Sequence, residues 1–477
     1  MLTISDGMKH ATGFSYVFGL LRANSPYGAE LIKRPRFFNR DELQIELDNV
    51  EAAIKTIKTT GKAVNRLEIS LMQLRDIRRS VARAHGSSLD EVEMFELKRF
   101  LLQLEIIAPL FDEMTATAEF KKIDIFRCED ALKLIDPDGS RLSSFFISEK
   151  MNSKLKPIRD EKRALEVKIR SALPAQATDL INKRQELAVL EENEEEIALT
   201  ELTIQLRPYL NDVEKNIESI AKLDFTISRA HLAIEYNAVK PVLNSNCFEA
   251  KGMINIEIKE NLEQKGLSFT PVSISLARGS TVITGANMGG KSVALKTLAL
   301  NSFLVHAGLF AFSESFKTPV FSHIFMINED KEDVSRSLSS FGGEIIALKT
   351  VLKHMSADSF IMIDEFARGT NPDEGALLAR RLVTLLSAKP SFSVITTHFD
   401  NVTCYASKHY RVKGLMSFDK DEARALVRSG LSGITAIARF MDFGLIETDK
   451  NDPCPKDAEN ICRLLLDDNE INMLFPD

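Results

Sequence analysis

The sequence predicts an α/β domain in the second half of the chain, preceded by a region that is almost entirely helical. Three observations support this fold class. A glycine-rich loop at 285–292 separates a short β-branched run from the start of a helix. A second apolar run, at 359–363, ends in two carboxylates, and strand and helix patterns alternate around both features. In residues 1 to about 150, apolar residues recur at helical spacing instead.

The helical spacing is clearest in two stretches near the N-terminus. Apolar residues recur three or four positions apart in Leu71–Val81 and again in Leu97–Leu104. The segment Asp136–Ser140 reads as a turn, because its proline presets φ, its glycine permits a positive φ and its acids bond to the local backbone. We therefore expect several packed helices before residue 150.

The segment from about 150 to 210 has a different composition, with many charges and few apolar residues. We expect an antiparallel helical hairpin here, with its tip at Ser171–Ala177 because Pro174 breaks a helix. Residues 150–170 carry eight basic and three acidic groups, and residues 179–201 carry two basic and eight acidic groups. These opposite charges favour pairing between the two halves of the hairpin. A glutamate cluster would also repel a DNA duplex lying against it, because DNA affinity depends on neutralising phosphates.

The glycine-rich loop carries the most specific chemistry in the chain. It fits the pattern G-x-x-x-x-G-K-[ST], in which the glycines turn backbone N–H groups toward phosphates, the lysine adds positive charge and the hydroxyl reaches Mg²⁺. The β-branched run Thr281–Thr284 leads into it and a helix follows, which makes an anion site at a helix N-terminus. A chance glycine turn is the weaker alternative. We expect ATP and Mg²⁺ to bind at Gly285, Ala286, Asn287, Met288, Gly289, Gly290, Lys291 and Ser292.

Two carboxylates, Asp364 and Glu365, follow the apolar run Ser359–Ile363. Such a run is typical of a parallel strand buried on both faces, and ligands bind at the carboxyl ends of these strands. We expect Asp364 to hold Mg²⁺ and Glu365 to polarise the attacking water. A strand that merely ends in solvated acids is common, but it is a weaker interpretation so soon after a phosphate loop.

His398 stands at the end of another β-branched run, Ser393–Thr397. An imidazole at a strand end can hydrogen-bond a γ-phosphate or the water beside it. Most single histidines are structural, and that alternative stays open. Its distance along the chain from the two carboxylates favours a catalytic or nucleotide-sensing role.

Together these motifs resemble the ATPase domain of the MutS family, a branch of the ABC-type ATPases. The motifs are the loop GANMGGKS, Asp364-Glu365 followed by Arg368-Gly369-Thr370, and Thr396-Thr397-His398-Phe399. The segment Ser337–Phe341 is similar to the family's S-x-S-T-F segment, which reaches the ATP held by the other subunit. The resemblance therefore implies a dimer in which Ser339 completes the partner's site. The most similar branch is the short MutS type two, here without a mismatch-reading domain or a C-terminal nuclease domain.

The resemblance implies an order of domains along the chain. We expect an ABC-type α/β P-loop ATPase domain preceded by an all-α core and lever domain with a projecting helical hairpin. The expected bounds are a helical core at 1–149, a clamp-like hairpin at 150–210, a lever helix at 211–240, the ATPase domain at 241–420 and a dimerisation segment at 421–477.

The overall composition is that of an ordinary globular protein. Of 477 residues, 44% are hydrophobic and 27% are charged, and the formal net charge is −7. The five cysteines contain no C-x-x-C pair, so neither a zinc site nor a disulfide framework is indicated. No signal peptide and no apolar run long enough to span a membrane is apparent, and we expect a cytoplasmic protein. The acidic balance is not typical of a protein that DNA wraps around.

The expected function is ATP hydrolysis in a composite site of a dimer, most simply a homodimer, which drives a clamp. By resemblance the substrate of the clamp is mismatched or branched DNA, in mismatch repair or recombination. The alternative is an ATPase that remodels a client protein, such as a reactivase of a cobalamin-dependent aminomutase. Some short MutS-like proteins of that kind resemble this chain in Ser339–Glu344 and Ala367–Pro372. An ABC transporter subunit is less consistent with the sequence, because an LSGGQ-like signature is missing.

Overall fold

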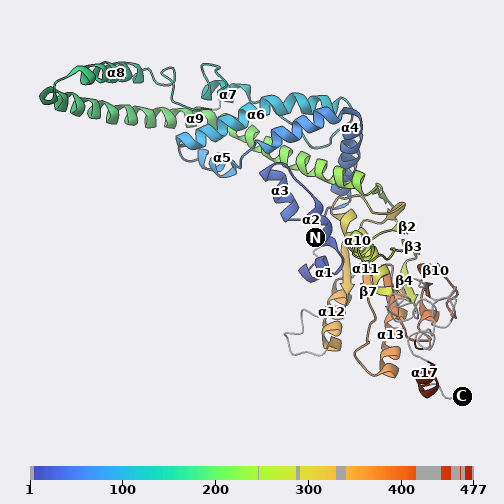
Figure 1. The fold of residues 1–477 in the computed structure, drawn as a ribbon. Coiled ribbons are helices and arrows are strands. Elements are labelled where there is room, and N and C mark those ends of the chain that lie inside the picture. The colour runs from blue at the N-terminus through green and yellow to red at the C-terminus, as the bar shows by residue number, and fades with distance from the viewer. Residues whose placement is uncertain are drawn as a thin grey trace. The chain divides into compact units, whose positions relative to one another are not determined.

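The computed structural model describes residues 5–142, 144–244, 246–285, 290–328, 340–414, 442–452, 462 and 468–474. The chain divides into two compact units (Figure 1). The helical unit comprises Arg22–Arg34 and Ala52–Ser228, and the α/β unit comprises Met1–Leu21, Pro35–Glu51 and Arg229–Asp477. A helical N-terminal region followed by a mixed α/β region confirms the predicted order of structural classes.

The helical unit is built from helices whose ends follow from local chemistry. Helix α6 begins at a capping box in which Asp90 and Glu93 each accept a backbone N–H of the other. Helix α3 begins at Pro26, whose fixed φ suits a first helical turn. The helices are α3 (Pro26–Lys33), α4 (Arg40–Met72), α5 (Arg78–Ala84), α6 (Glu91–Thr115), α7 (Glu129–Ile135), α8 (Leu155–Ser171) and α9 (Pro174–Glu235), of which α4 and α9 continue into the α/β unit.

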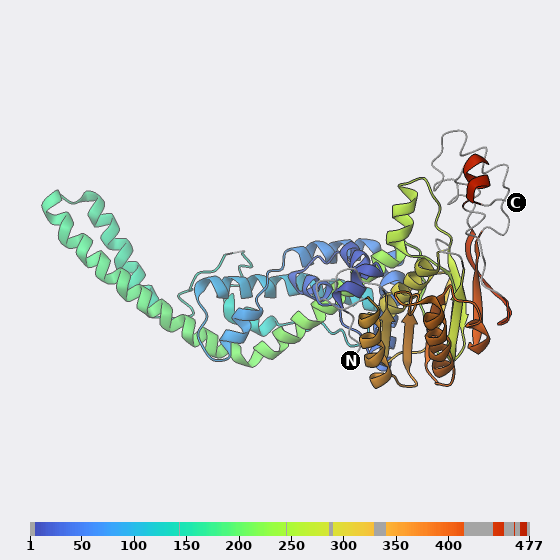
Figure 2. The same ribbon diagram turned by 90° about the horizontal axis from the view of Figure 1, so that it is seen from below.

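Helix α8 runs beside the first part of α9 in both views (Figures 1 and 2). Only Ala172 and Leu173 join the two helices. The predicted tip at Ser171–Ala177 is therefore too long: Pro174 is the first residue of α9, a position where its missing N–H costs nothing.

Ion pairs cross between these two helices, as the opposite charges predict. Arg159 is the best placed, because its guanidinium reaches Glu191 at 2.9 Å and Glu195 at 2.7 Å from a largely buried position. Three of the glutamates in the acidic run of α9 are thus directed at α8 rather than at solvent. The remaining cross-helix pairs are Lys162–Glu191, Lys154–Glu194, Lys183–Glu161 and Arg184–Glu166.

The α/β unit contains two sheets among its described residues. The larger has the strand order β10-β9-β4-β8-β7-β6, in which β10 is antiparallel to β9 and the other neighbours are parallel. Its strands are β4 (Gly279–Thr284), β6 (His323–Ile327), β7 (Ser359–Ile363), β8 (Phe392–Thr397), β9 (Lys408–Gly414) and β10 (Asp442–Glu447). The smaller has the order β1-β5-β2-β3, from β1 (Val242–Leu243), β2 (Phe248–Met253), β3 (Val272–Leu276) and β5 (Ser315–Thr318).

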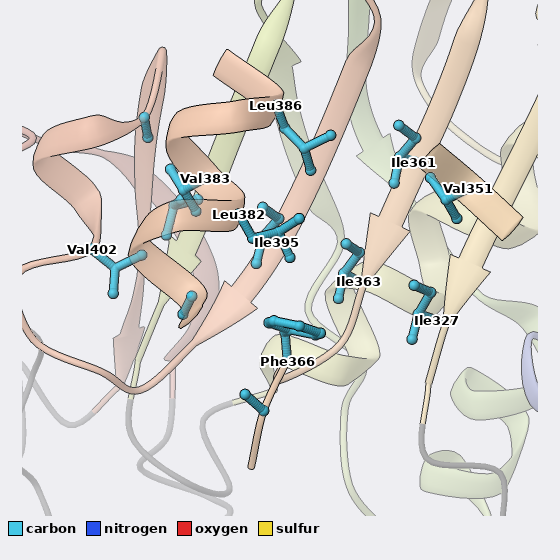
Figure 3. Packing of buried hydrophobic residues seen from close by; sticks show 14 residues of the cluster. Ile327, Val351, Ile361, Ile363, Phe366, Leu382, Val383, Leu386, Ile395 and Val402 are labelled. Carbon is cyan, nitrogen blue, oxygen red and sulfur yellow. The ribbon is translucent and has the colours of Figure 1, made fainter. Parts of the chain in front are cut away.

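Helices cover the larger sheet because its central strands are apolar on both faces. Every residue of β4, β7 and β8 is buried. One hydrophobic cluster joins α13 to β7 and β8, with Phe366 beside Ile363 at its lower edge (Figure 3). The helices of this unit are α1 (Asp6–Ala11), α2 (Phe14–Leu20), α10 (Ile256–Glu263), α11 (Lys291–His306), α12 (Ser340–His354), α13 (Pro372–Ser387) and α17 (Asp468–Leu474). Among the described residues, we find no helix with the length and apolar character needed to cross a membrane.

Helix α11 ends in a buried histidine that the fold holds in its neutral form. The His306 Nδ1 lies 2.8 Å from the carbonyl oxygen of Ser302, and its Nε2 accepts the Phe321 N–H at 2.9 Å. Because one ring nitrogen faces an acceptor and the other a donor, only the neutral ring satisfies both. Burial lowers the pKa of His306 to about 4.

We predict that His306 makes the α/β unit sensitive to mild acid. Its ordinary pKa is 6.5 and its folded pKa is about 4, so the unfolded chain binds the proton more readily between these values. The contribution of neutral His306 to the free energy of unfolding is complete above pH 6.5. It falls as the pH drops toward 4, by about 3 kcal/mol in total. Urea unfolding from pH 4.5 to 8 should show this loss in the parent and a flatter profile in His306→Gln. Parallel profiles would contradict the assignment.

Candidate functional site

Three strand ends meet at one edge of the larger sheet. Strand β8 lies between β4 and β7, with Thr284 opposite Thr397 and Ile363 opposite Ile395. Because all three strands are parallel, the residues that follow them gather at their carboxyl ends, where α/β sheets bind ligands. The order of strands therefore brings the glycine loop, the two carboxylates and His398 together.

The glycine loop turns into α11 at Gly290. Gly290 caps the helix with φ 87°, a left-handed conformation that favours glycine. A Cβ built there would also lie 2.7 Å from the Phe443 ring on β10. The start of α11 at Lys291 leaves helix N–H groups pointing toward the loop, the arrangement that attracts phosphate. Residues 286–289 of the predicted loop lie outside the described residues.

Lys291 is buried beneath this loop, with only 3% of its side chain exposed. Its Nζ donates to the carbonyl oxygen of Gly285 at 2.8 Å and lies 3.1 Å from Glu365 Oε1. A buried ammonium without a paired carboxylate would be costly, so Glu365 compensates its charge.

Ser292 and Asp364 form the second contact between loop and strand end. The Ser292 hydroxyl donates to Asp364 Oδ1 at 3.1 Å, and the Thr396 hydroxyl donates to the same oxygen at 2.6 Å. These oxygens suit Mg²⁺, which takes hard oxygen ligands and usually completes its shell with phosphate and water. Nowhere in the described ranges do three or more His, Cys, Asp or Glu side chains gather in a metal-binding group. The Ser292 hydroxyl and the Asp364 carboxylate are donors that fit Mg²⁺ held jointly with a nucleotide.

Glu365 lies at the centre of the charges. Its side chain is 12% exposed, and besides Lys291 it meets the Arg368 guanidinium at 3.1 Å. His398 Nδ1 is 3.9 Å from Glu365 Oε1 and is buried with no hydrogen bond to the described residues. Burial lowers the pKa of His398, and the charges of Lys291 and Arg368 lower it further against the opposing effect of Glu365. The imidazole is therefore neutral near pH 7 and retains an acceptor nitrogen.

All of the sequence-predicted site residues that the structure describes converge at this edge. Gly285, Gly290, Lys291, Ser292, Asp364, Glu365 and His398 do so, whereas Ser339 and residues 286–289 lie outside the described part of the chain. Sequence reasoning gave no role to Thr396 or Glu344. Thr396 stands inside the strand-end motif that contains His398, and Glu344 ends the quoted segment Ser339–Glu344, but neither motif indicates which backbone N–H the side chain accepts.

Fold and site together define the class: an α/β domain whose glycine loop opens a helix beside two strand-end carboxylates. Comparison with known proteins points to one family for the part of the chain that contains the site. Residues 281–431 match the family model of MutS domain V. This part of the chain is therefore similar to MutS-family proteins, and the match to individual relatives covers about half of the chain.

Curated relatives named endonuclease MutS2 match about half of the chain. The protein of Acetivibrio thermocellus is 33% identical over 236 residues, which are 49% of this chain and 29% of that protein. The protein of Leuconostoc mesenteroides is 27% identical over 278 residues, 57% of this chain and 34% of the relative. The protein of Halalkalibacterium halodurans is 30% identical over 247 residues, which are 51% of this chain and 30% of that protein. The match thus spans about a third of each relative.

We predict that Gly290→Ala weakens nucleotide binding. The substitution places a Cβ against the Phe443 ring and forces alanine into φ 87°, at a cost of about 1–2 kcal/mol from the backbone alone. We expect about a tenfold loss of affinity in titrations with a fluorescent ATP analogue. Adding Phe443→Ala should remove the clash and recover only part of this loss. Gly343→Ala on α12, where a Cβ meets nothing within 4 Å, is the matched control and should bind normally.

Proposed function

We propose that the chain binds and hydrolyses ATP at the edge formed by β4, β8 and β7. The observation that carries this proposal is the paired contact between loop and strand end: Ser292 with Asp364, and Lys291 with Glu365. Lys291 would neutralise phosphate charge, and Ser292 and Asp364 would hold Mg²⁺. The metal would offset the negative charge that develops on the phosphates. The match of residues 281–431 to MutS domain V supports the same function.

The contacts of Glu365 suggest how binding prepares hydrolysis. Its carboxylate is held between Lys291 and Arg368. A phosphate bound at the loop would compete for the Lys291 ammonium and release one oxygen of Glu365. That oxygen would then be available to orient the attacking water, with His398 as a neutral hydrogen-bonding neighbour. Ser339 from a second copy would complete the site, which makes a homodimer part of this proposal.

We predict that Glu365→Gln separates binding from hydrolysis. Removing the water-orienting carboxylate should lower the hydrolysis rate by about 10²–10⁴-fold. ATP affinity should persist or rise, because Lys291 loses its competing partner. Phosphate-release assays and nucleotide titrations measure the two effects, with Glu263→Gln on the exposed side of α10 as control. Lys291→Ala should instead abolish binding, and a normal hydrolysis rate in Glu365→Gln would refute the assignment.

We propose DNA as the substrate of the hairpin formed by α8 and the first part of α9. The relatives are named endonucleases, and the outer face of α8 is basic: Lys156, Arg163 and Arg170 recur at seven-residue spacing and are exposed. Arg163 has 68% of its side chain exposed and makes two long ionic contacts, with Asp160 at 3.5 Å and with Glu149 at 3.7 Å, which would not prevent it from meeting a phosphate. Mismatched or branched DNA and a clamp action are the specific form of this proposal.

We predict that DNA binding depends on this face of α8. Each neutralised phosphate contributes about −0.9 to the slope of log affinity against log salt. Replacing Lys156, Arg163 and Arg170 by alanine should therefore make that slope shallower by about 2–3 in anisotropy titrations with homoduplex, mismatched and branched DNA. The control is the double variant Glu186→Gln with Glu201→Gln, which removes two acidic groups on α9 instead of basic groups on α8. An absence of binding by the parent even at low salt would exclude DNA as the substrate.

A protein client is the second candidate, and a different face favours it. On α9, Leu190, Ile197 and Ile204 recur at seven-residue spacing with 51%, 44% and 51% of their surface exposed. The exposed Glu186 and Glu201 lie along the same stripe. An acidic, apolar helix face repels DNA and suits a basic amphipathic helix, as a client enzyme would offer. A synthetic Leu/Lys helical peptide should bind the parent and lose affinity for Ile197→Glu if this candidate is correct.

A further inference from the structure

The turn that carries Glu365 is strained at two places. Glu365 has φ 50° and Ala367 has φ 63°, both in the left-handed region that residues with a Cβ rarely adopt. Each such residue costs about 1 kcal/mol or more, and the conformation persists only where the surroundings impose it. The source of that constraint therefore matters for where the Glu365 carboxylate lies.

Three contacts from separate elements hold the turn. The Glu365 N–H donates to the Thr396 hydroxyl on β8 at 2.9 Å. The Phe366 ring is buried in the hydrophobic cluster against β7 and α13 (Figure 3). The Ala367 N–H donates to Glu344 Oε2 on α12 at 2.8 Å. The first contact comes from a strand and the second from the hydrophobic core, whereas the third is a hydrogen bond to the side chain of a helix residue.

The contact between the Glu344 carboxylate and the Ala367 N–H is shielded from solvent. Glu344 is 7% exposed and Ala367 is completely buried. A buried carboxylate is costly unless it accepts strong hydrogen bonds, and a charged acceptor makes a stronger bond to a backbone N–H than a neutral one. Because Ala367 is buried, its N–H would lose this acceptor if the carboxylate moved away. The turn would then lose the bond that offsets its strain at φ 63°.

We propose that Glu344 is a positioning residue for hydrolysis: it fixes the 365–367 turn through the Ala367 N–H and so sets the direction of the Glu365 carboxylate. Helix α12 begins at Ser340, only four residues before Glu344. A displacement of α12 would therefore reach the turn of Glu365 through this bond as well as through the shared hydrophobic cluster, and the position of α12 would regulate the hydrolysis rate. The proposal rests on the proposed function only in that Glu365 orients water.

Two substitutions at Glu344 test whether an acceptor oxygen at this position holds the turn. Glu344→Gln keeps the size of the side chain and an oxygen that accepts the Ala367 N–H, whereas Glu344→Ala removes the acceptor. We expect Glu344→Ala to lower kcat by about 10–100-fold, equivalent to one or two displaced hydrogen bonds, and to leave nucleotide affinity within about twofold. Glu344→Gln should stay within about threefold of the parent in both quantities. An equal loss of rate in the two variants would show that an acceptor oxygen at this position does not hold the turn, and it would overturn the proposal.

Ala367→Gly provides an independent rescue. Glycine adopts φ 63° without strain, so in the Glu344→Ala background it should restore kcat by about fivefold, although the bond itself stays broken. A double variant no faster than Glu344→Ala would contradict the role of the strained turn.

Amide hydrogen exchange tests the turn without nucleotide or catalysis. Exchange in the peptide containing 364–370 should be faster in Glu344→Ala than in the parent and unchanged in Glu344→Gln. If the parent hydrolyses no ATP, the proposed function fails, while the exchange result still decides whether Glu344 holds the turn. If exchange and kcat are both unchanged in Glu344→Ala, the positioning role is refuted even though the ATPase assignment stands.

Discussion

The parallel pairing of β8 with β4 on one side and β7 on the other determines where every polar group of the site lies. Parallel strands align their carboxyl ends, so residues separated by more than a hundred positions in the chain become neighbours at one edge. The strands can pair this way because their side chains are apolar on both faces and helices cover them. A change in strand order would separate Lys291 from Glu365 and Ser292 from Asp364 without altering any motif.

The buried charges at this edge favour phosphate binding more than they stabilise the fold. Lys291 and Glu365 compensate each other, and Asp364 accepts bonds from two hydroxyls. Burying such groups rarely adds net stability, because desolvation offsets the attraction between them. Their value lies in preorganisation: dipoles and charges already face the place where phosphate charge would lie and need little rearrangement. The strained turn at 365–367 is consistent with a site that stores free energy for function.

The sequence predicted the edge itself well, and for a physical reason. A continuous apolar run followed by polar residues identifies a strand end, and the parallel sheet brings such ends together, so Asp364, Glu365 and His398 were found without coordinates. Thr396 and Glu344 were not, because a hydroxyl or carboxylate that bonds a distant backbone N–H leaves no periodic signal. Helix α9 runs through 174–235 with Pro208 inside it, so one helix contains the second half of the expected hairpin and most of the expected lever helix. The helical pattern there is real, but tertiary packing decides where the helix ends.

The charges of the hairpin show why net charge is a poor guide to its partner. Glu191, Glu194 and Glu195 appear in the sequence as an acidic run, yet each is paired with a basic side chain of α8. The acids that a partner would meet are others, such as Glu186 and Glu201 beside the exposed apolar stripe of α9. The basic groups that it would meet lie on the outer face of α8. A DNA duplex and a basic helix would therefore approach different faces of one hairpin, and the two candidate partners need not exclude each other. The cross-helix pairs remove from the surface much of the repulsion that the glutamate cluster suggests, so the acidic composition argues against DNA only where it approaches α9.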